Sequence, residues 1–152
     1  MTNEDQLVDY NSAMSAFEAK HFSRAMSLLS PFANEGNAEA QHRVAIMYQN
    51  GLGCAQNDEL AIKWMTTSAE QGYAMAQHGL GFMYMEGECT AKDIEAAIKW
   101  FSLAADQGLA GSQTTLAMMY HEGNVVEKDI ELAKKYYAMA GFDEFVKELE
   151  SE

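Results

Sequence analysis

The chain has 152 residues, of which 48% are hydrophobic, so it can bury a substantial core and is not wholly disordered. Its formal net charge of −13 argues against unaided binding to nucleic acid or anionic lipid, because both need Lys and Arg to displace counterions. No stretch approaches the roughly 18 consecutive apolar residues of a membrane-spanning helix. The first residues lack the basic and apolar regions of a secretory signal. We therefore expect a soluble cytoplasmic protein, or a periplasmic or secreted one if an export signal was removed.

The composition and the hydrophobic pattern favour an all-α fold. There is a single proline, alanine and methionine are plentiful, and no segment alternates with period two over the length of a strand. In chain order, the first predicted helices cover about residues 4–19 and 22–35 and are joined by a short turn. They form a degenerate opening unit, residues 4–37, in which Ala25 and Ala33 stand 36 positions before Ala61 and Ala69.

A period of 36 residues begins at Ala38 and recurs at Ala74 and Ala110. The same spacing aligns glutamine, methionine, tyrosine, glycine and lysine positions, namely Gln41/Gln77/Gln113, Met47/Met83/Met119, Tyr48/Tyr84/Tyr120, Gly51/Gly87/Gly123 and Lys63/Lys99/Lys135. So many coincidences at one period indicate stacked supersecondary units. Each unit is predicted to be a helix–loop–helix pair, and the three pairs cover residues 38–73, 74–109 and 110–141.

The boundaries of each predicted pair follow from its glycine and capping positions. In the first full unit the buried stripe of the first helix has helical spacing, at Gln41, Val44, Ala45 and Tyr48. Gly51 is expected to end that helix, because glycine adopts a left-handed conformation without a Cβ clash. Asn57 is a suitable N-cap for the second helix, as Asp93 and Asp129 are in the later units.

The last segment departs from the period. Gly141 stands where the two preceding units carry alanine, so the second helix of the third full unit is expected to stop near Ala140. Residues 142–152 are predicted to form a short helix with an apolar stripe at Phe142, Phe145, Val146 and Leu149. Because a solenoid leaves an apolar face uncovered at its end, we interpret this segment as a capping helix. The alternative is that it docks a second chain.

One family resemblance covers most of the chain. The run from Ala74 to Gly108 contains A-x-A-Q-x-x-L-G-x-M-Y-x-x-G and then D-x-x-x-A-x-K-W-x-x-x-A-A-x-Q-G, and it resembles the Sel-one-like repeat, a relative of the tetratricopeptide repeat. Ala45 and Ala117 stand where the family usually has the glycine found at Gly81. The resemblance implies one domain over residues 1–152, an α–α superhelix (solenoid) of about four antiparallel helix pairs plus a capping helix. It also implies an adaptor or scaffold without chemistry of its own.

A direct search for catalysis finds no nucleophile elbow, no phosphate-binding glycine loop and no zinc-protease helix. His42, His78 and His121 lie on the first helices of successive units, but histidines one repeat apart do not provide the converging ligands of a metal site. We expect surface imidazoles, no metal and no cofactor. Cys54 and Cys89 occupy nearly equivalent loops and are expected to be free, partly packed thiols.

A second stripe runs along the first helix of each unit, and by similarity to tetratricopeptide proteins it lines the concave face. This first-helix stripe comprises Tyr10, Met14 and Phe17, then His42, Ile46 and Gln49, then His78, Phe82 and Met85, then Thr114, Met118 and His121. Glu86 and Glu122 add carboxylates at equivalent helix ends. Apolar residues on a face that the core does not need often mark a binding site. The alternative is that Ile46, Phe82 and Met118 only pack between neighbouring first helices.

These observations predict a non-enzymatic adaptor or scaffold that binds a partner protein or peptide in its concave groove. A partner with apolar anchors flanked by Lys or Arg would match both the stripe and its carboxylates. One alternative is a β-lactam-binding or hydrolysing repeat protein, although members with that role carry paired cysteines within each unit and this chain does not. The other alternative is a structural protein that dimerises through its terminal helix. The expected state is a monomer or a weak dimer.

Overall fold

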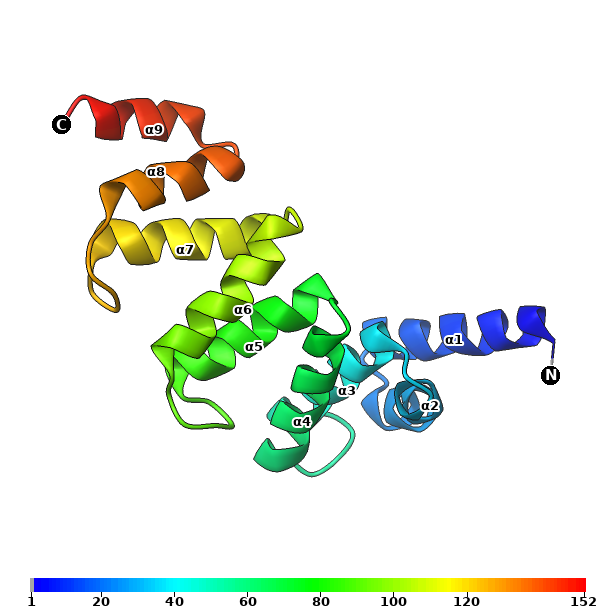
Figure 1. Ribbon diagram of the computed structural model, residues 1–152. Coiled ribbons are helices and arrows are strands. Elements are labelled where there is room, and N and C mark those ends of the chain that lie inside the picture. Colours follow the sequence, from blue (N-terminus) through cyan, green and yellow to red (C-terminus); the bar gives the residue numbers. More distant parts are fainter. Residues whose placement is uncertain (1) are drawn as a thin grey trace.

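The computed structural model describes residues 2–152, and within that range the chain forms helices and no strand. The helices are α1 (Asn3–Glu18), α2 (Phe22–Asn34), α3 (Ala38–Asn50), α4 (Asp58–Glu70), α5 (Ala74–Glu86), α6 (Ile94–Asp106), α7 (Ala110–Glu122), α8 (Ile130–Met139) and α9 (Asp143–Glu150). They stack in chain order, so that α1 and α9 lie at opposite ends of the molecule (Figure 1). The predicted all-α solenoid is confirmed.

The core is divided along the stack, because each helix packs mainly against its neighbours in sequence. One cluster of buried side chains joins α1, α2 and α3, a second joins α3, α4 and α5, and a third joins α6, α7, α8 and α9. Such a stack has no single centre, and each unit is stabilised by the interface with the next.

The loop between the two helices of each full unit has the same construction three times. The first helices α3, α5 and α7 end at glycines with φ between 66° and 70°, a left-handed conformation that favours glycine. The backbone N–H of the residue that caps the next helix then donates to a tyrosine carbonyl, at 2.9 Å in each of the pairs Asn57/Tyr48, Asp93/Tyr84 and Asp129/Tyr120. The side chains of these caps accept from the first turns of α4, α6 and α8, as predicted.

A buried glutamine joins each unit to the one before it. The side-chain amides donate to carbonyls at the end of the preceding second helix, from Gln41 to Ala33 at 3.0 Å, from Gln77 to Ala69 at 3.2 Å and from Gln113 to Ala105 at 3.0 Å. The side-chain oxygens of Gln41 and Gln77 accept from Gln71 and Gln107 at 2.7 and 2.9 Å. We call this set the glutamine ladder.

The second helices place their largest buried side chain against a small residue of the first helix. Phe101 is fully buried, and a Cβ added at Gly81 would lie 2.7 Å from two of its ring atoms. The preceding unit has Ala45 and Met65 at the equivalent positions, both buried in one cluster. Glycine inside a helix is less favourable than alanine by about 1 kcal/mol. Gly81 is therefore explained by the room that Phe101 needs.

The terminal helix α9 packs against α8 and only partly matches its predicted stripe. Leu149 is buried, and Phe145 and Val146 are half-buried against the same cluster. Phe142, by contrast, is 48% exposed. The expectation that Phe142 belongs to the buried stripe is wrong, because it lies just before the helix, at the N-cap, where its ring meets Tyr137 edge-on.

We predict that Gly81→Ala destabilises the protein by about 1–3 kcal/mol, because overpacking against the Phe101 ring outweighs the gain in helix propensity. Gly111→Ala is the matched control, since a Cβ there meets its nearest neighbour at 3.4 Å, an ordinary contact. Adding Phe101→Met to Gly81→Ala recreates the alanine–methionine pair of the preceding unit. The double variant should therefore lose less than the sum of the single losses. Urea denaturation compares the parent with Gly81→Ala, Gly111→Ala, Phe101→Met and the double variant. The size-matching argument is wrong if Gly81→Ala unfolds no more readily than Gly111→Ala.

Candidate functional site

Two neighbouring hollows lie along α5, α7 and α9. The first, which we call the α5–α7 hollow, has a volume of about 500 Å³ and is lined by Phe82, Met85, Glu86, Lys92, Thr115, Met118, Met119, Glu122 and Val125. The second, the α7–α9 hollow, has a volume of about 460 Å³ and is lined by Thr114, Met118, Glu122, Tyr137, Phe142 and Phe145. Both volumes lie in the range of pockets that accept small groups or side chains.

Met118 and Glu122 line both hollows and stand one helical turn apart on α7, so they form the ridge between them. Met118 is 46% exposed, and Phe82 and Phe142, one in each hollow, are also exposed. Large apolar side chains gathered on one exposed face are a feature of interaction surfaces. The predicted positions Phe82, Met85, Glu86, Thr114, Met118 and Glu122 therefore lie together at the surface.

Phe82 combines the two roles that the sequence left open. Its ring packs edge-on against Phe101 at 5.1 Å and against His78 at 4.9 Å between ring centroids. The remaining part of the ring faces the α5–α7 hollow. Phe82 is thus positioned by the core beneath it and still presents an apolar surface to solvent.

His78 and His121 hold the helices that line the hollows. Nδ1 of His78 shares a hydrogen bond of 2.7 Å with the hydroxyl of Ser112, which ties α5 to α7, and burial lowers the pKa of His78. Nδ1 of His121 lies 3.3 Å from the hydroxyl of Tyr137, and its ring packs against Phe145. Both imidazoles are partly buried and serve as positioning groups for neighbouring side chains.

The expectation of a surface imidazole is wrong for His42, which is only 5% exposed. The ring of Tyr73 packs against it at 5.4 Å, and burial, helped by the nearby charge of Arg43, lowers the pKa of His42 to about 4. Its Nδ1 has no hydrogen-bond partner among residues 2–152. At the position of Ser112, which serves His78, the preceding unit has Ala76, and this substitution explains the missing partner.

The other predicted positions are used in packing between helices. Tyr10 packs edge-on against Phe32, and Phe17 against Phe22 with the Arg43 guanidinium 4.9 Å from its ring centre. Met14 and Ile46 are half-buried against the clusters of their own units. The side-chain amide of Gln49 donates to Glu88 in the next loop at 2.9 Å. The N-terminal half of the first-helix stripe is therefore largely occupied, whereas the half on α5 and α7 faces the hollows.

Sequence reasoning missed several lining residues, which are Lys92, Thr115, Met119, Val125, Tyr137, Phe142 and Phe145. Thr115 and Met119 lie one position beyond the predicted stripe on α7, and this adjacency was a usable signal. Lys92 recurs at Lys128 in the next loop, but Val125 has no apolar counterpart at the equivalent positions Gly53 and Cys89 of the earlier loops.

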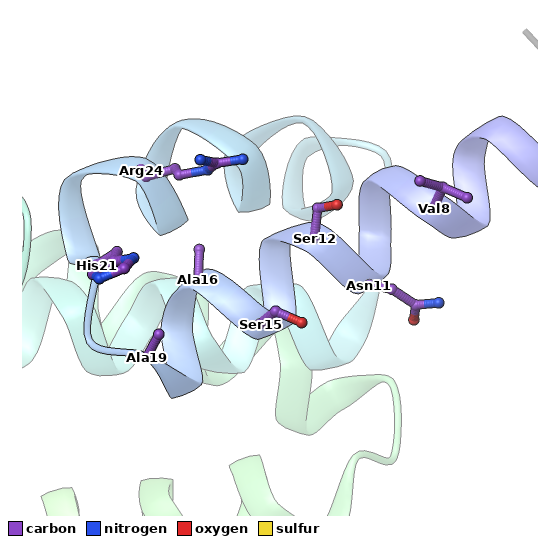
Figure 2. Close-up of a pocket in the computed structure, with 8 residues that line it drawn as sticks. All are labelled: Val8, Asn11, Ser12, Ser15, Ala16, Ala19, His21 and Arg24. Atoms are coloured by element: carbon purple, nitrogen blue, oxygen red, sulfur yellow. The ribbon is translucent and has the colours of Figure 1, made fainter.

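A third hollow lies at the other end of the stack and does not involve the first-helix stripe. It has a volume of about 450 Å³ and is lined by Val8, Asn11, Ser12, Ser15, Ala16, Ala19, His21 and Arg24 (Figure 2). The side chains come from α1 and from the start of α2 (Figure 2). Ser12 and Ser15 stand 32 positions before Val44 and Met47, which are buried against α2. This face of α1 is thus a polar version of a stacking face, the kind of surface that the end of a solenoid needs.

The comparisons with known proteins agree with this architecture. The profile of the Sel1 repeat matches residues 38–73, 74–109 and 110–141. The fold is similar to the crystal structure of a Sel1 repeat protein from Oxalobacter formigenes, with a TM-score of 0.79 and 31% identity over 86% of this chain. It is also similar to a protective antigen present in uropathogenic Escherichia coli strains that displays an SLR fold, with a TM-score of 0.77 and 29% identity over 94% of this chain.

This chain spans 54% and 34% of the lengths of those two proteins. No curated protein matches the chain. In the part of the chain that the structure describes, no cluster of three His, Cys, Asp or Glu side chains is placed to hold a metal ion. None of the helices described is both long and apolar enough to cross a membrane.

We predict that Ala76→Ser stabilises the protein by about 1 kcal/mol, because its hydroxyl gives Nδ1 of His42 the partner that Ser112 gives to His78. Ala40→Ser is the matched control. It places a hydroxyl at the equivalent buried position of the unit before, where Tyr10 stands in place of a histidine. Thermal unfolding should show a gain for Ala76→Ser and a loss for Ala40→Ser, and equal losses would contradict the assignment of the missing partner.

The low pKa of His42 also predicts a loss of stability in acid. Between its ordinary value of 6.5 and the value of about 4 in the fold, the unfolded chain binds a proton that the folded chain does not. Stability should therefore decrease as the pH falls through this window. His42→Phe should reduce the loss between pH 7 and pH 4.5 by about 2 kcal/mol, as measured by urea denaturation at both values. The same loss in both proteins would show that His42 titrates normally.

Proposed function

Because the chain belongs to the Sel1 repeat family, we propose that it is a protein-interaction scaffold whose α5–α7 hollow binds a segment of a partner protein. Sel1 repeat proteins generally act as such scaffolds and typically lack enzymatic activity. The observation that carries the proposal is Met118, an apolar side chain 46% exposed between two hollows. Burial of a solvent-exposed methionine by a partner is favourable, and its flexible thioether side chain adapts to the shape of that partner.

The charges around the α5–α7 hollow support a partner with basic residues. Glu86 and Glu122 lie at equivalent ends of α5 and α7, and neither takes part in an ion pair within residues 2–152. Lys92, in the loop after α5, adds one positive charge to the lining of this hollow. With a net charge of −13 in the whole chain, the field at this surface attracts cationic segments and repels nucleic acid.

No observation favours a β-lactam-directed activity. Cys54 and Cys89 are free and lie in separate loops. Burial and the hydrogen bond to the Asp58 carboxylate raise the pKa of Cys89 to about 12, and burial also raises the pKa of Cys54. Both thiols are therefore protonated at neutral pH, and a protonated thiol is a poor nucleophile.

The test compares two exposed methionines. Met118→Ala removes the ridge between the hollows, whereas Met139→Ala removes a methionine of α8 that is 39% exposed and lines neither hollow. Both variants should fold normally. Truncation of a binding anchor weakens affinity by about 2 kcal/mol, or roughly 30-fold. In affinity capture from a lysate of the native cells with quantitative mass spectrometry, the partner is the protein lost with Met118→Ala and retained with Met139→Ala. If no protein distinguishes the two variants, the proposal is wrong.

A further inference from the structure

The N-cap residue of α9 is Phe142, which is not a residue type that normally caps a helix. The side chain of Phe142 makes no capping hydrogen bond, although serine, threonine, aspartate and asparagine are strongly preferred at this position. The equivalent residue at the start of α3, Asn37, does cap its helix by accepting from the N–H of Ala40 at 2.8 Å. Phe142 therefore weakens α9 in two ways. Its apolar ring is exposed to solvent, and its side chain accepts no hydrogen bond from the first turn of the helix.

Packing accounts for the apolar N-caps elsewhere but not for Phe142. Tyr73 at the start of α5 covers the buried ring of His42, and Leu109 at the start of α7 is partly buried. Phe142 meets Tyr137 edge-on at 6.3 Å and remains 48% exposed. Local rules of stability that are broken without a gain in packing tend to occur at functional positions.

The exposed ring of Phe142 completes the α7–α9 hollow. Met118 and Glu122 form one wall of this hollow, Phe142 and Phe145 form the other, and Tyr137 lies between them. Burial, and then the negative charge of Glu122, raise the pKa of the Tyr137 hydroxyl, so the Glu122 carboxylate acts on this hollow as well as on the α5–α7 hollow. The two apolar hollows on either side of Met118 thus share one carboxylate, that of Glu122, which forms no ion pair within residues 2–152.

We propose that α9 is part of the recognition surface, and that the ligand is a protein segment with two apolar side chains and a Lys or Arg between them. One apolar side chain enters each hollow, on either side of Met118, and the cation pairs with Glu122. This inference rests on the proposed function and adds the second hollow and the class of ligand. The occupant is basic because the ridge offers a carboxylate without an ion-pair partner in residues 2–152, within a strongly acidic chain.

The probes are short fluorescein-labelled peptides with one arginine between two leucines, synthesised over a series of spacings. Matched peptides carry glutamate in place of the arginine. Fluorescence anisotropy should show that one spacing binds best and that the glutamate peptide binds at least about tenfold more weakly. Glu122→Gln should reduce this discrimination, whereas Glu70→Gln, which removes an exposed charge from α4 outside both hollows, should not.

Phe142→Ser separates binding from folding. Serine is a good N-cap, so the variant should melt at the same or a higher temperature than the parent, although it has lost the aromatic wall. Its affinity for the arginine peptide should fall at least about tenfold. If Phe142→Ser binds normally while Met118→Ala does not, α9 is only a cap and the inference is wrong, although the proposed function stands.

Other outcomes also overturn the inference. If no arginine peptide binds, or if arginine and glutamate peptides bind equally, the ligand class is wrong. If sedimentation shows a dimer that Phe142→Ser dissociates, the occupant of the α7–α9 hollow is a second copy of the chain. The proposed function fails separately, when the lysate capture does not distinguish Met118→Ala from Met139→Ala.

Discussion

The glutamine ladder is the interaction on which the stacking depends. The last carbonyls of a helix have no partner within that helix, and in a buried interface they need a donor from elsewhere. Each of the carbonyls of Ala33, Ala69 and Ala105 accepts from the N–H of a glycine that follows its helix and, as a second donor, from the side chain of Gln41, Gln77 or Gln113. Gln41 and Gln77 also accept from Gln71 and Gln107, which cap the second helices of their own units. Apolar packing has no direction, whereas these hydrogen bonds do. The ladder therefore fixes the orientation of each unit relative to the one before, and it brings the first helices into register.

The end of the ladder explains why α9 differs from the first helices. Position 143 would carry the next donor, 36 residues after Gln107, but it is Asp143, and Gly141 stands where Ala105 stands one unit earlier. α8 has 10 residues, whereas α4 and α6 have 13, so the chain turns into α9 ahead of the period. Without this early turn, Phe142 would lie within the second helix instead of at the edge of the α7–α9 hollow.

The positions that recur with the period could be predicted from the sequence, and the positions where one unit differs from the next could not. The glycine ends and the N-caps Asn57, Asp93 and Asp129 followed from repetition alone. The exposed face of Phe82 and Met118 was expected from the resemblance to tetratricopeptide proteins, with packing between first helices as the open alternative. The burial of His42 did not, because it depends on Tyr73, an aromatic residue at an N-cap that no pattern marks as a cover. An amphipathic stripe indicates which face of a helix is apolar. It does not indicate how far along the helix that face is covered, and Phe142 is the residue left uncovered.

The core and the hollows are linked through one set of equivalent positions on the second helices α4, α6 and α8, which we call the column. Met65, Phe101 and Tyr137 occupy equivalent positions, and the side chains of the first-helix stripe lie above them. Phe101 supports the ring of Phe82, while Tyr137 itself lines the α7–α9 hollow. Phe101 leaves room only for glycine opposite, at Gly81, whereas Tyr137 in the same column has Ala117 at the equivalent position. A change of one core pair therefore alters the shape of the surface above it. The glutamine ladder lies one helical turn from this column, at Ala69 and Ala105, where its hydrogen bonds hold the neighbouring helices in register.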